Sequence, residues 1–238
     1  MNAIALSEIG KVRKENEDSY LVSMERGLYA VADGMGGYAG GQVASGIAIR
    51  ILDEEVASLV SPDNCSCSEM LLNSLLKANK QILEQGKDEE YFGMGTTVTA
   101  ARLFPGKLCI AHIGDSRAYL FREGSFRLLT QDHSLVNELL QKGELTMEEA
   151  LNHPRRNILT RALGVNEQPQ IDLLDLSVQK GDLLLLCTDG LYNQVTDEEI
   201  QEIFTVQDSL KVKVEKMVNL ALERGGNDNI TAVLVQCE

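Results

Sequence analysis

Short apolar runs that alternate with tight turns dominate the first half of the chain. The runs form three pairs, over 19–24 and 28–32, 96–104 and 107–113, and 118–122 and 126–129. A turn that contains glycine joins each pair, which is typical of a β-hairpin. Because hairpins make neighbouring strands antiparallel, the pattern argues against a doubly wound parallel sheet.

Apolar residues recur at helical spacing in other stretches. We predict helices over 43–52, 71–83 and 210–222, and a closing strand over 231–236. Capping boxes at 66–69 and 196–199 mark the starts of the second of these helices and of a further helix. Amphipathic helices that flank antiparallel sheets predict a layered α+β fold, in which residues 131–168 form a polar, partly helical insertion between sheet segments.

The composition is close to that of ordinary soluble globular proteins, because the 238 residues are 44% hydrophobic and 24% charged. The length is typical of one large domain or two small ones. No apolar run approaches the roughly 20 residues of a membrane span, and the N-terminus has no basic segment followed by an apolar one. We therefore expect a cytoplasmic protein that does not act at a membrane.

Charge and cysteine content exclude further classes of protein. The chain carries 22 Lys and Arg against 36 Asp and Glu, a net charge of −14, whereas a nucleic-acid binder usually presents a basic face. We expect no nucleic-acid partner. The five cysteines are odd in number and show no C-x-x-C pair, which argues against a disulfide framework and against a zinc site.

Four aspartates occupy similar places at the ends of apolar strands, each beside a glycine or another small residue: Asp33, Asp115, Asp189 and Asp228. One such aspartate alone often caps a turn. If the four meet at one edge of the fold, two carboxylates about 4 Å apart repel by about 4 kcal/mol at an effective dielectric constant of about 20, so they need counter-charge. Oxygen ligands without a thiolate pair suit Mg²⁺ or Mn²⁺ better than Zn²⁺.

A charged stretch just before the first hairpin adds an arginine and two carboxylates. Such a stretch is usually a solvated loop, but Arg13 is the residue type that grips phosphate with two hydrogen bonds, and Glu17 and Asp18 are suited to orient metal-bound water. Paired divalent cations about 3.5–4 Å apart hold a bridging hydroxide and stabilise in-line displacement at phosphorus. The sequence thus indicates phosphate chemistry at paired metals.

Six segments that contain these residues occur in order along the chain. They read RxxxED, VADGMGG, GTT, GDSR, TDGL and GNDNIT, and they begin at Arg13, Val31, Gly95, Gly114, Thr188 and Gly226. Together they resemble the signature set of the metal-dependent type 2C protein Ser/Thr phosphatases, and the match extends from about residue 5 to about residue 236. The chain is most similar to the compact bacterial branch of this family, whose members are catalytic domains with a mobile flap.

The resemblance implies a fold and an activity. The fold is a four-layer αββα sandwich of two antiparallel sheets flanked by helices, formed by residues 1–238 as a single catalytic domain in which about 131–168 form the flap. The activity is hydrolysis of phosphoserine and phosphothreonine by direct attack of a metal-bridged water or hydroxide, with Mn²⁺ or Mg²⁺ as the cofactor. The implied partners are phosphorylated proteins, the targets of a cognate Ser/Thr kinase, and the implied enzyme is a monomer.

The resemblance also implies the ligands of the metal ions. Asp33 would bridge two core ions, and Gly34 would offer its carbonyl oxygen. Asp189 and Asp228 would complete the core site. Asp115, together with Asp189, would hold a third and more weakly bound ion.

Other roles follow from the same resemblance. Arg13 would bind the substrate phosphate, and Glu17 and Asp18 would act through water. Met35 is a departure, because some relatives carry histidine there as a proposed general acid and methionine has no proton to donate. The general acid therefore stays unassigned. Asn193 stands where some relatives carry another metal-binding carboxylate.

The three histidines do not fill the role of the acid. His112 faces the side of its strand opposite to Asp115, so we expect it to be packed within the fold. His133 and His153 fall in or near the flap. We expect these two side chains to be exposed to solvent.

Two other functions are compatible with parts of the sequence. Residues 34–39 satisfy the G-x-G-x-x-A pattern of a dinucleotide site, with Asp53 and Glu54 at the distance of a ribose contact, but a parallel strand would have to follow. The second alternative is a metal-bound scaffold that binds phosphoproteins without hydrolysing them. Binding of NAD(P) would identify the first, and failure to turn over p-nitrophenyl phosphate would identify the second.

Overall fold

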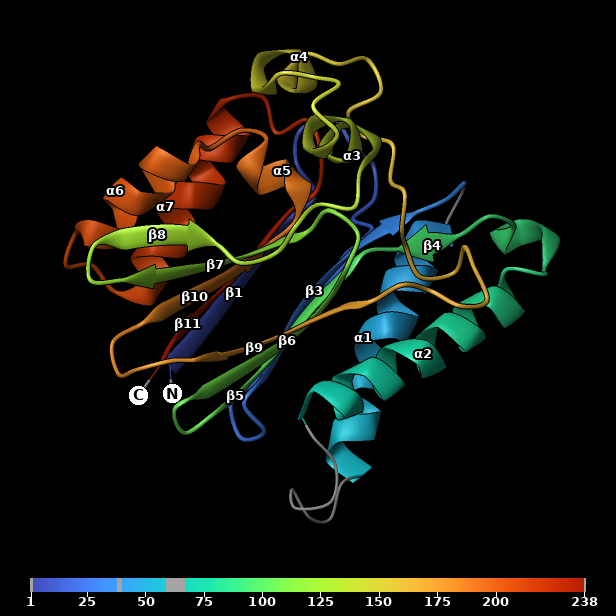
Figure 1. Ribbon diagram of the computed structural model, residues 1–238, viewed down its shortest axis with the longest axis horizontal. Coiled ribbons are helices and arrows are strands. Elements are labelled where there is room, and N and C mark those ends of the chain that lie inside the picture. The colour runs from blue at the N-terminus through green and yellow to red at the C-terminus, as the bar shows by residue number, and fades with distance from the viewer. Residues whose placement is uncertain (1, 38–39, 59–66, 238) are drawn as a thin grey trace.

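A computed structural model describes residues 2–37, 40–58 and 67–237. Its centre is a pair of antiparallel sheets (Figure 1). The first sheet has the order β1 (Asn2–Glu8), β11 (Ile230–Gln236), β10 (Leu183–Cys187), β7 (Arg117–Arg122) and β8 (Ser125–Leu128). The second has the order β2 (Asp18–Ser23), β3 (Leu28–Met35), β5 (Val98–Phe104), β6 (Lys107–Ile113) and β9 (Asp172–Ser177), and the short β4 (Gly95–Thr96) pairs with β3.

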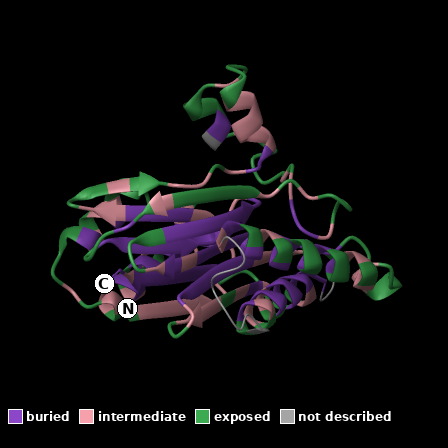
Figure 2. Ribbon diagram, turned by 60° about the horizontal axis from the view of Figure 1, so that its bottom comes forward, coloured by how far each residue is buried: buried purple, intermediate pink, exposed green. Residues whose placement is uncertain are grey.

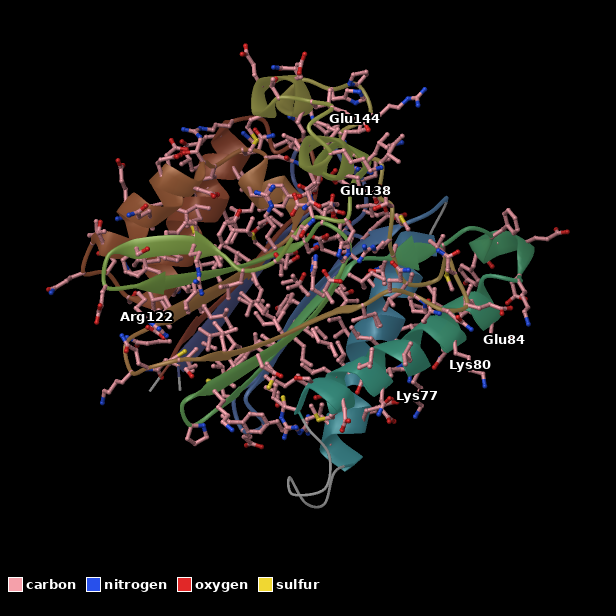
Figure 3. All side chains as sticks on the ribbon, viewed as in Figure 1. Lys77, Lys80, Glu84, Arg122, Glu138 and Glu144 are labelled. Carbon is pink, nitrogen blue, oxygen red and sulfur yellow. The ribbon has the colours of Figure 1, made fainter. Side chains whose placement is uncertain are left out.

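Helices cover the outer face of each sheet. The second sheet packs against α1 (Gly40–Ser58) and α2 (Cys67–Gln85), and the first packs against α6 (Asp197–Thr205) and α7 (Leu210–Glu223) (Figure 1). The outward side chains of α2, among them Lys77, Lys80 and Glu84, point into solvent (Figure 3). These layers confirm the predicted αββα sandwich.

The central strands read as continuous apolar runs because both of their faces are buried (Figure 2). In β10, Leu184 and Leu186 point into the core between the sheets, whereas Leu183, Leu185 and Cys187 pack under the helices of the first sheet. This alternation follows from the two-residue period of a strand. A sheet covered on both sides needs apolar residues at every position, which explains the sequence Leu183–Cys187.

All three predicted hairpins are present, with antiparallel registers between β2 and β3, β5 and β6, and β7 and β8. The strand predicted over 96–104 is divided into β4 and β5. Both pieces pair with β3 in the same register, and the break falls at Thr97. Thr96 also exchanges two backbone hydrogen bonds with Leu163, of 3.0 and 2.9 Å. The predicted capping box at 196–199 is confirmed at α6, whereas that at 66–69 includes Ser66, which lies outside the described residues.

The chain between β8 and β9 contains α3 (Leu135–Gln141) and α4 (Met147–Leu151), which project beyond the ends of the sheets (Figure 1, Figure 2). We call residues 131–168 the insertion. An isolated bridge between Ser134 and Leu159 joins the two ends of the insertion, and a second one between Thr96 and Leu163 attaches it to β4. Within the described part of the chain, no helix is long and apolar enough to cross a membrane.

Candidate active site

The strand ends at one edge of the sandwich bring the predicted residues together. One cavity of about 340 Å³ opens there. Its lining includes every residue to which a site role was assigned, apart from Asp18: Arg13, Glu17, Asp33, Gly34, Asp115, Asp189 and Asp228. The β2–β3 register places Asp18 directly opposite Asp33.

Asp18 is buried behind the cavity and is held from the side of the first sheet. Its Oδ2 accepts hydrogen bonds from the hydroxyls of Thr188, at 2.8 Å, and Thr231, at 2.6 Å. Its Oδ1 has no hydrogen-bond partner. Burial, followed by the charges of Asp189 and Asp228, raises the pKa of Asp18 to about 7 despite these hydrogen bonds.

Asp33 lies at the end of β3, where its backbone is fixed by neighbouring threonines. Its N–H donates to Thr97 Oγ1 at 3.0 Å, and its carbonyl oxygen accepts from the Thr97 N–H at 2.9 Å and from Thr96 Oγ1 at 2.9 Å. These bonds fix the backbone, and the Asp33 side chain lines the cavity. Burial, and then repulsion by Asp18, raises the pKa of Asp33 well above its usual range.

Gly34 allows a very close approach of three chain segments. Its N–H donates to the Glu17 carbonyl oxygen at 3.2 Å. A Cβ at this position would overlap the Gly41 carbonyl oxygen and lie 2.7 Å from that of Glu17. Any side chain at position 34 would thus push the Glu17 loop away from the cavity. Burial raises the pKa of the Glu17 carboxyl group, and its Oε1 has no hydrogen-bond partner.

Arg13 and Asp228 form an ion pair at the mouth of the cavity, with 2.7 Å between Arg13 Nη2 and Asp228 Oδ2. The Arg13 side chain keeps 48% of its surface exposed. The hydrogen bond that Arg13 donates to Asp228 raises the pKa of Arg13, so the guanidinium stays charged. Arg13 therefore lies where an incoming phosphate would meet it, and the carboxylate that it contacts is a predicted metal ligand.

Asp115 and Asp189 approach from two further strand ends. Gly114, with a φ of +108°, makes the turn before Asp115, and the Tyr192 hydroxyl donates to the Asp115 carbonyl oxygen at 3.1 Å. Asp189 begins α5 (Asp189–Tyr192) and accepts a 3.1 Å hydrogen bond from Asn193. Burial and neighbouring carboxylates raise the pKa of Asp115 to about 8 and that of Asp189 to about 6.

Sequence reasoning missed the role of Asn229. Its Nδ2 donates to the carbonyl oxygens of Ile9 and Glu15, both at 2.9 Å, and its Oδ1 accepts from the Glu17 N–H at 2.8 Å. Asn229 thus ties the loop that carries Arg13 to the start of β11. The signal was weak, because an asparagine that follows an aspartate is common in any turn.

The histidines differ in part from expectation. His112 is buried in β6, as predicted. The prediction for His133 is wrong, because only 4% of it is exposed. Its Nδ1 accepts from the Gly114 N–H and its Nε2 donates to Asp172, both at 3.1 Å. The start of the insertion packs back onto the turn before Asp115, which buries this ring. His153 is half-buried rather than exposed.

The donor set at the cavity fits divalent cations. Three buried carboxylate oxygens, on Glu17, Asp18 and Asp189, lack hydrogen-bond partners, and buried carboxylates without counter-charge are costly. All charged donors are hard oxygens, as Mg²⁺ and Mn²⁺ prefer. No three His, Cys, Asp or Glu side chains in the described ranges close into a ligand cluster, so backbone carbonyls and water have to complete the coordination.

The dinucleotide alternative is wrong. After β3 the chain forms α1 and α2, and β3 pairs antiparallel with β5 rather than with a parallel strand. Asp53, the candidate ribose contact, forms an ion pair with Arg26. The glycine-rich segment that follows Asp33 therefore serves the carboxylate cavity.

Comparisons of sequence and of structure all match this chain to protein phosphatases. The sequence profile of the family described as Protein phosphatase 2C matches residues 11–235. A Listeria welshimeri protein named Serine/threonine phosphatase stp is 40% identical over 99% of this chain and 96% of its own length. The Streptococcus agalactiae serine/threonine phosphatase has a similar structure, with a TM-score of 0.94 and 37% identity over 100% of this chain and 99% of that one.

A further solved structure contains metal ions. It is the catalytic domain of the serine threonine protein phosphatase PstP in complex with two manganese ions. It is similar to this chain with a TM-score of 0.89 and 36% identity, over 99% of this chain and 97% of that one.

Proposed function

The chain belongs to the protein phosphatase 2C family and is a metal-dependent protein Ser/Thr phosphatase, and we propose that it cleaves the phosphate ester by direct attack of water, without a covalent phosphoenzyme. The observation that carries this proposal is the cavity itself. It gathers five carboxylates and two arginines, Arg13 and Arg161, and two of these carboxylates have a buried oxygen without a hydrogen-bond partner.

The proposed ligands divide between a core site and an outer one. Asp33 would lie between two Mn²⁺ or Mg²⁺ ions, with Gly34, Asp189 and Asp228 as the other protein ligands, and Asp115 with Asp189 would hold a weaker third ion. When bound, such ions lower the pKa of water and neutralise charge on the phosphoryl group. Glu17 and Asp18 would accept hydrogen bonds from ordered water, since each keeps an unpartnered oxygen.

Arg13 would bind and orient the phosphate. Its charge is permanent, its side chain is half-exposed, and it reaches the cavity from the loop that Asn229 holds. If Asp228 held an ion, the Nη2 donor of Arg13 that contacts this carboxylate would be available for a phosphate oxygen. Met35 lines the cavity but cannot donate a proton. The leaving alkoxide would therefore take its proton from metal-bound water, or from a group that reaches it only in the complex with the substrate.

The lining also limits the possible nucleophiles. Of the described residues around the cavity, none is Cys, His or Ser. A phosphocysteine, phosphohistidine or phosphoserine intermediate has no candidate residue there, whereas the lining carboxylates and Thr97 and Thr160 leave an acyl phosphate or a phosphothreonine to be tested by labelling.

The test combines metal dependence with a search for a phosphoenzyme. We expect p-nitrophenyl phosphate and a phosphothreonine peptide to be hydrolysed with Mn²⁺, and activity to vanish after EDTA treatment and return with Mn²⁺. Acid-quenched mixtures with a ³²P-labelled peptide should contain no labelled protein. Binding of the phosphopeptide without turnover would instead identify the scaffold alternative, and a labelled protein would exclude direct attack.

The cellular setting forms part of the same proposal. The substrates would be cytoplasmic proteins phosphorylated by a cognate Ser/Thr kinase, and the enzyme would act as a monomer with the insertion as a flap over a single catalytic domain. The support is the similarity to bacterial Ser/Thr phosphatases along almost the whole chain. Light scattering tests the monomer, and comparison of phosphoproteomes with and without the enzyme tests the substrates.

A further inference from the structure

A second cavity, also of about 340 Å³, lies between the insertion and the body of the molecule. In Figure 1, α3 and α4 lie beyond α5 at this edge of the sandwich. The insertion and β8 contribute aliphatic side chains to the lining: Leu128, Val136, Leu140, Met147 and Ala150. Several of them remain accessible to water, since Met147 is 66% and Leu128 is 37% exposed.

The second cavity adjoins the catalytic one. Asp115, Asn157 and Asp189 line both. A peptide that places its phosphorylated residue in the catalytic cavity therefore passes the entrance of the second cavity. Because an extended chain advances about 3.3 Å per residue, side chains one to three positions away lie within roughly 10 Å of the phosphorylated residue.

The charged residues that line this cavity are Arg117, Arg156, Asp115, Asp132 and Asp189, and Arg117 is already engaged. Arg117 donates to both oxygens of Asp132, at 2.7 and 3.0 Å, and to the Tyr119 hydroxyl at 2.9 Å. Its guanidinium also stacks on the ring of Tyr192, 3.7 Å from the ring centre. With these donors used and one face covered, Arg117 is not arranged to bind an anion. The lining carboxylates disfavour an acidic side chain, and the aliphatic walls offer contact to an apolar one.

We propose that this second cavity receives an aliphatic side chain of the substrate protein, located one to three positions from the phosphorylated residue. The inference rests on the proposed function, and it adds a sequence preference to it. Burial of that side chain against Leu140 and Val136 removes apolar surface of both partners from water. A loss of a few methylene groups from such a contact lowers kcat/KM by about tenfold.

The first experiment compares phosphothreonine peptides that differ at one position. In a polyalanine background, leucine, alanine or glutamate is placed in turn at each position from −3 to +3, and kcat/KM is measured with Mn²⁺. We expect leucine to exceed alanine by about tenfold at one position and glutamate to be the poorest there. A flat profile in an enzyme that hydrolyses all of the peptides would overturn the inference and leave the phosphatase function intact.

The second experiment assigns the preference to the cavity. Leu140 lines it, whereas the adjacent Leu139 on α3 does not, and both are half-buried. Leu140→Ala should abolish the preference for leucine, and the matched control Leu139→Ala should keep it. Leu140→Lys should reverse the order, so that the glutamate peptide becomes better than the leucine peptide. Turnover of p-nitrophenyl phosphate should be unchanged in all three variants, because this ester does not reach the second cavity.

Two results would contradict the assignment. Equal losses on peptides and on p-nitrophenyl phosphate in the Leu140 variants would mean that α3 shapes the catalytic cavity instead. A dimer that dissociates in Leu140→Lys, detected by light scattering, would mean that a second copy of the chain covers this surface. Reversal of the peptide preference in a folded, active Leu140→Lys enzyme has neither explanation, because it requires contact between position 140 and the substrate.

Discussion

The aspartates at the catalytic cavity are buried close to one another, with too few hydrogen bonds and positive charges to stabilise their ionised forms. Asp18, Asp33, Asp115 and Asp189 all have raised pKa values because burial and neighbouring carboxylates disfavour their ionised forms. Their backbones are nevertheless held firmly, as the three hydrogen bonds at Asp33 show. A rigid frame around poorly paired carboxylates is the arrangement expected of a site that binds cations.

Asp33 is the residue whose replacement should separate catalysis from folding. Asp33→Asn keeps the size of the side chain and removes a buried charge, so the metal-free protein should unfold at the same or a higher temperature. The kcat with Mn²⁺ should fall by several orders of magnitude, because the bridging ligand is lost. The matched control is Asp53→Asn, which removes a surface ion pair with Arg26 and should leave kcat unchanged. Retained activity in Asp33→Asn would remove it from the metal site.

Arg13 should affect substrate binding more than stability. Its ion pair with Asp228 is exposed, and such pairs contribute at most about 1 kcal/mol to stability. Arg13→Ala should raise KM, and should also lower kcat if the contact strengthens as charge redistributes at phosphorus. Lys14→Ala, at a neighbouring exposed residue, should change neither constant. If the two variants have the same kcat/KM as the unchanged enzyme, Arg13 does not contact the phosphate.

At the scale of elements, the sequence pattern predicted the hairpin strands, whose partners are adjacent along the chain. The glycine turns specify the hairpin strands almost alone, since neighbours along the chain supply the pairing. The run Leu183–Cys187 could be recognised because both of its faces are buried and every residue in it is apolar. By contrast, β1 and β9 were not predicted. Most of β9 is exposed, and it exists as a strand because it pairs with β6. Edge strands of this kind carry little signal in their own residues.

Buried histidines couple the insertion to the sheet and give stability a pH dependence. Burial lowers the pKa of His112 from 6.5 to about 4, and its Nε2 donates to the Gln131 carbonyl oxygen at 3.0 Å. Between these two pH values only the unfolded chain binds the proton. The contribution of His112 is therefore complete above about pH 6.5 and is lost as the pH falls toward 4, by up to about 3 kcal/mol.

Chemical denaturation from pH 7.5 to 4.5 measures this contribution. The free energy of unfolding should fall less steeply with decreasing pH in His112→Gln than in the unchanged protein. His153→Gln is the control, because this half-buried residue lies on the insertion away from β6. Parallel curves for His112→Gln and the unchanged protein would show that His112 titrates alike in the folded and unfolded states.

At the scale of the whole molecule, the site depends on contacts that no local pattern contains. The strand-end aspartates could be found in the sequence because each stands in a recognisable setting. Thr188, Thr231 and Asn229 could not be assigned, because their partners Asp18, Ile9 and Glu15 lie far away along the chain. Thr188 and Thr231 meet Asp18 only after the two sheets pack together, and Asn229 meets Ile9 only after β1 pairs with β11. The burial of His133 has the same origin, since it requires the insertion to fold back onto Gly114.

The two sheets each contribute part of the site, and this gives metal binding a structural consequence. Asp33 belongs to β3 of the second sheet, whereas Asp189 and Asp228 lie at strand ends of the first. Ions held between them would link the sheets and stabilise only the folded state. At a free Mn²⁺ concentration of 100 times Kd, this linkage amounts to about 2.7 kcal/mol, or a rise in Tm of about 5–10 °C for a domain of this size.

Calorimetry with Mn²⁺ and with EDTA measures this rise in Tm and distinguishes the proposed sites. Asp33→Asn should lose the rise, because both core ions depend on that carboxylate. Asp115→Ala should keep most of it while turnover falls, because in the proposed division Asp115 would hold only the weaker third ion and the core ligands would remain. If Asp115→Ala abolished the rise as completely as Asp33→Asn, Asp115 would be a core ligand, and the division between a tight pair of ions and a weaker outer one would be wrong.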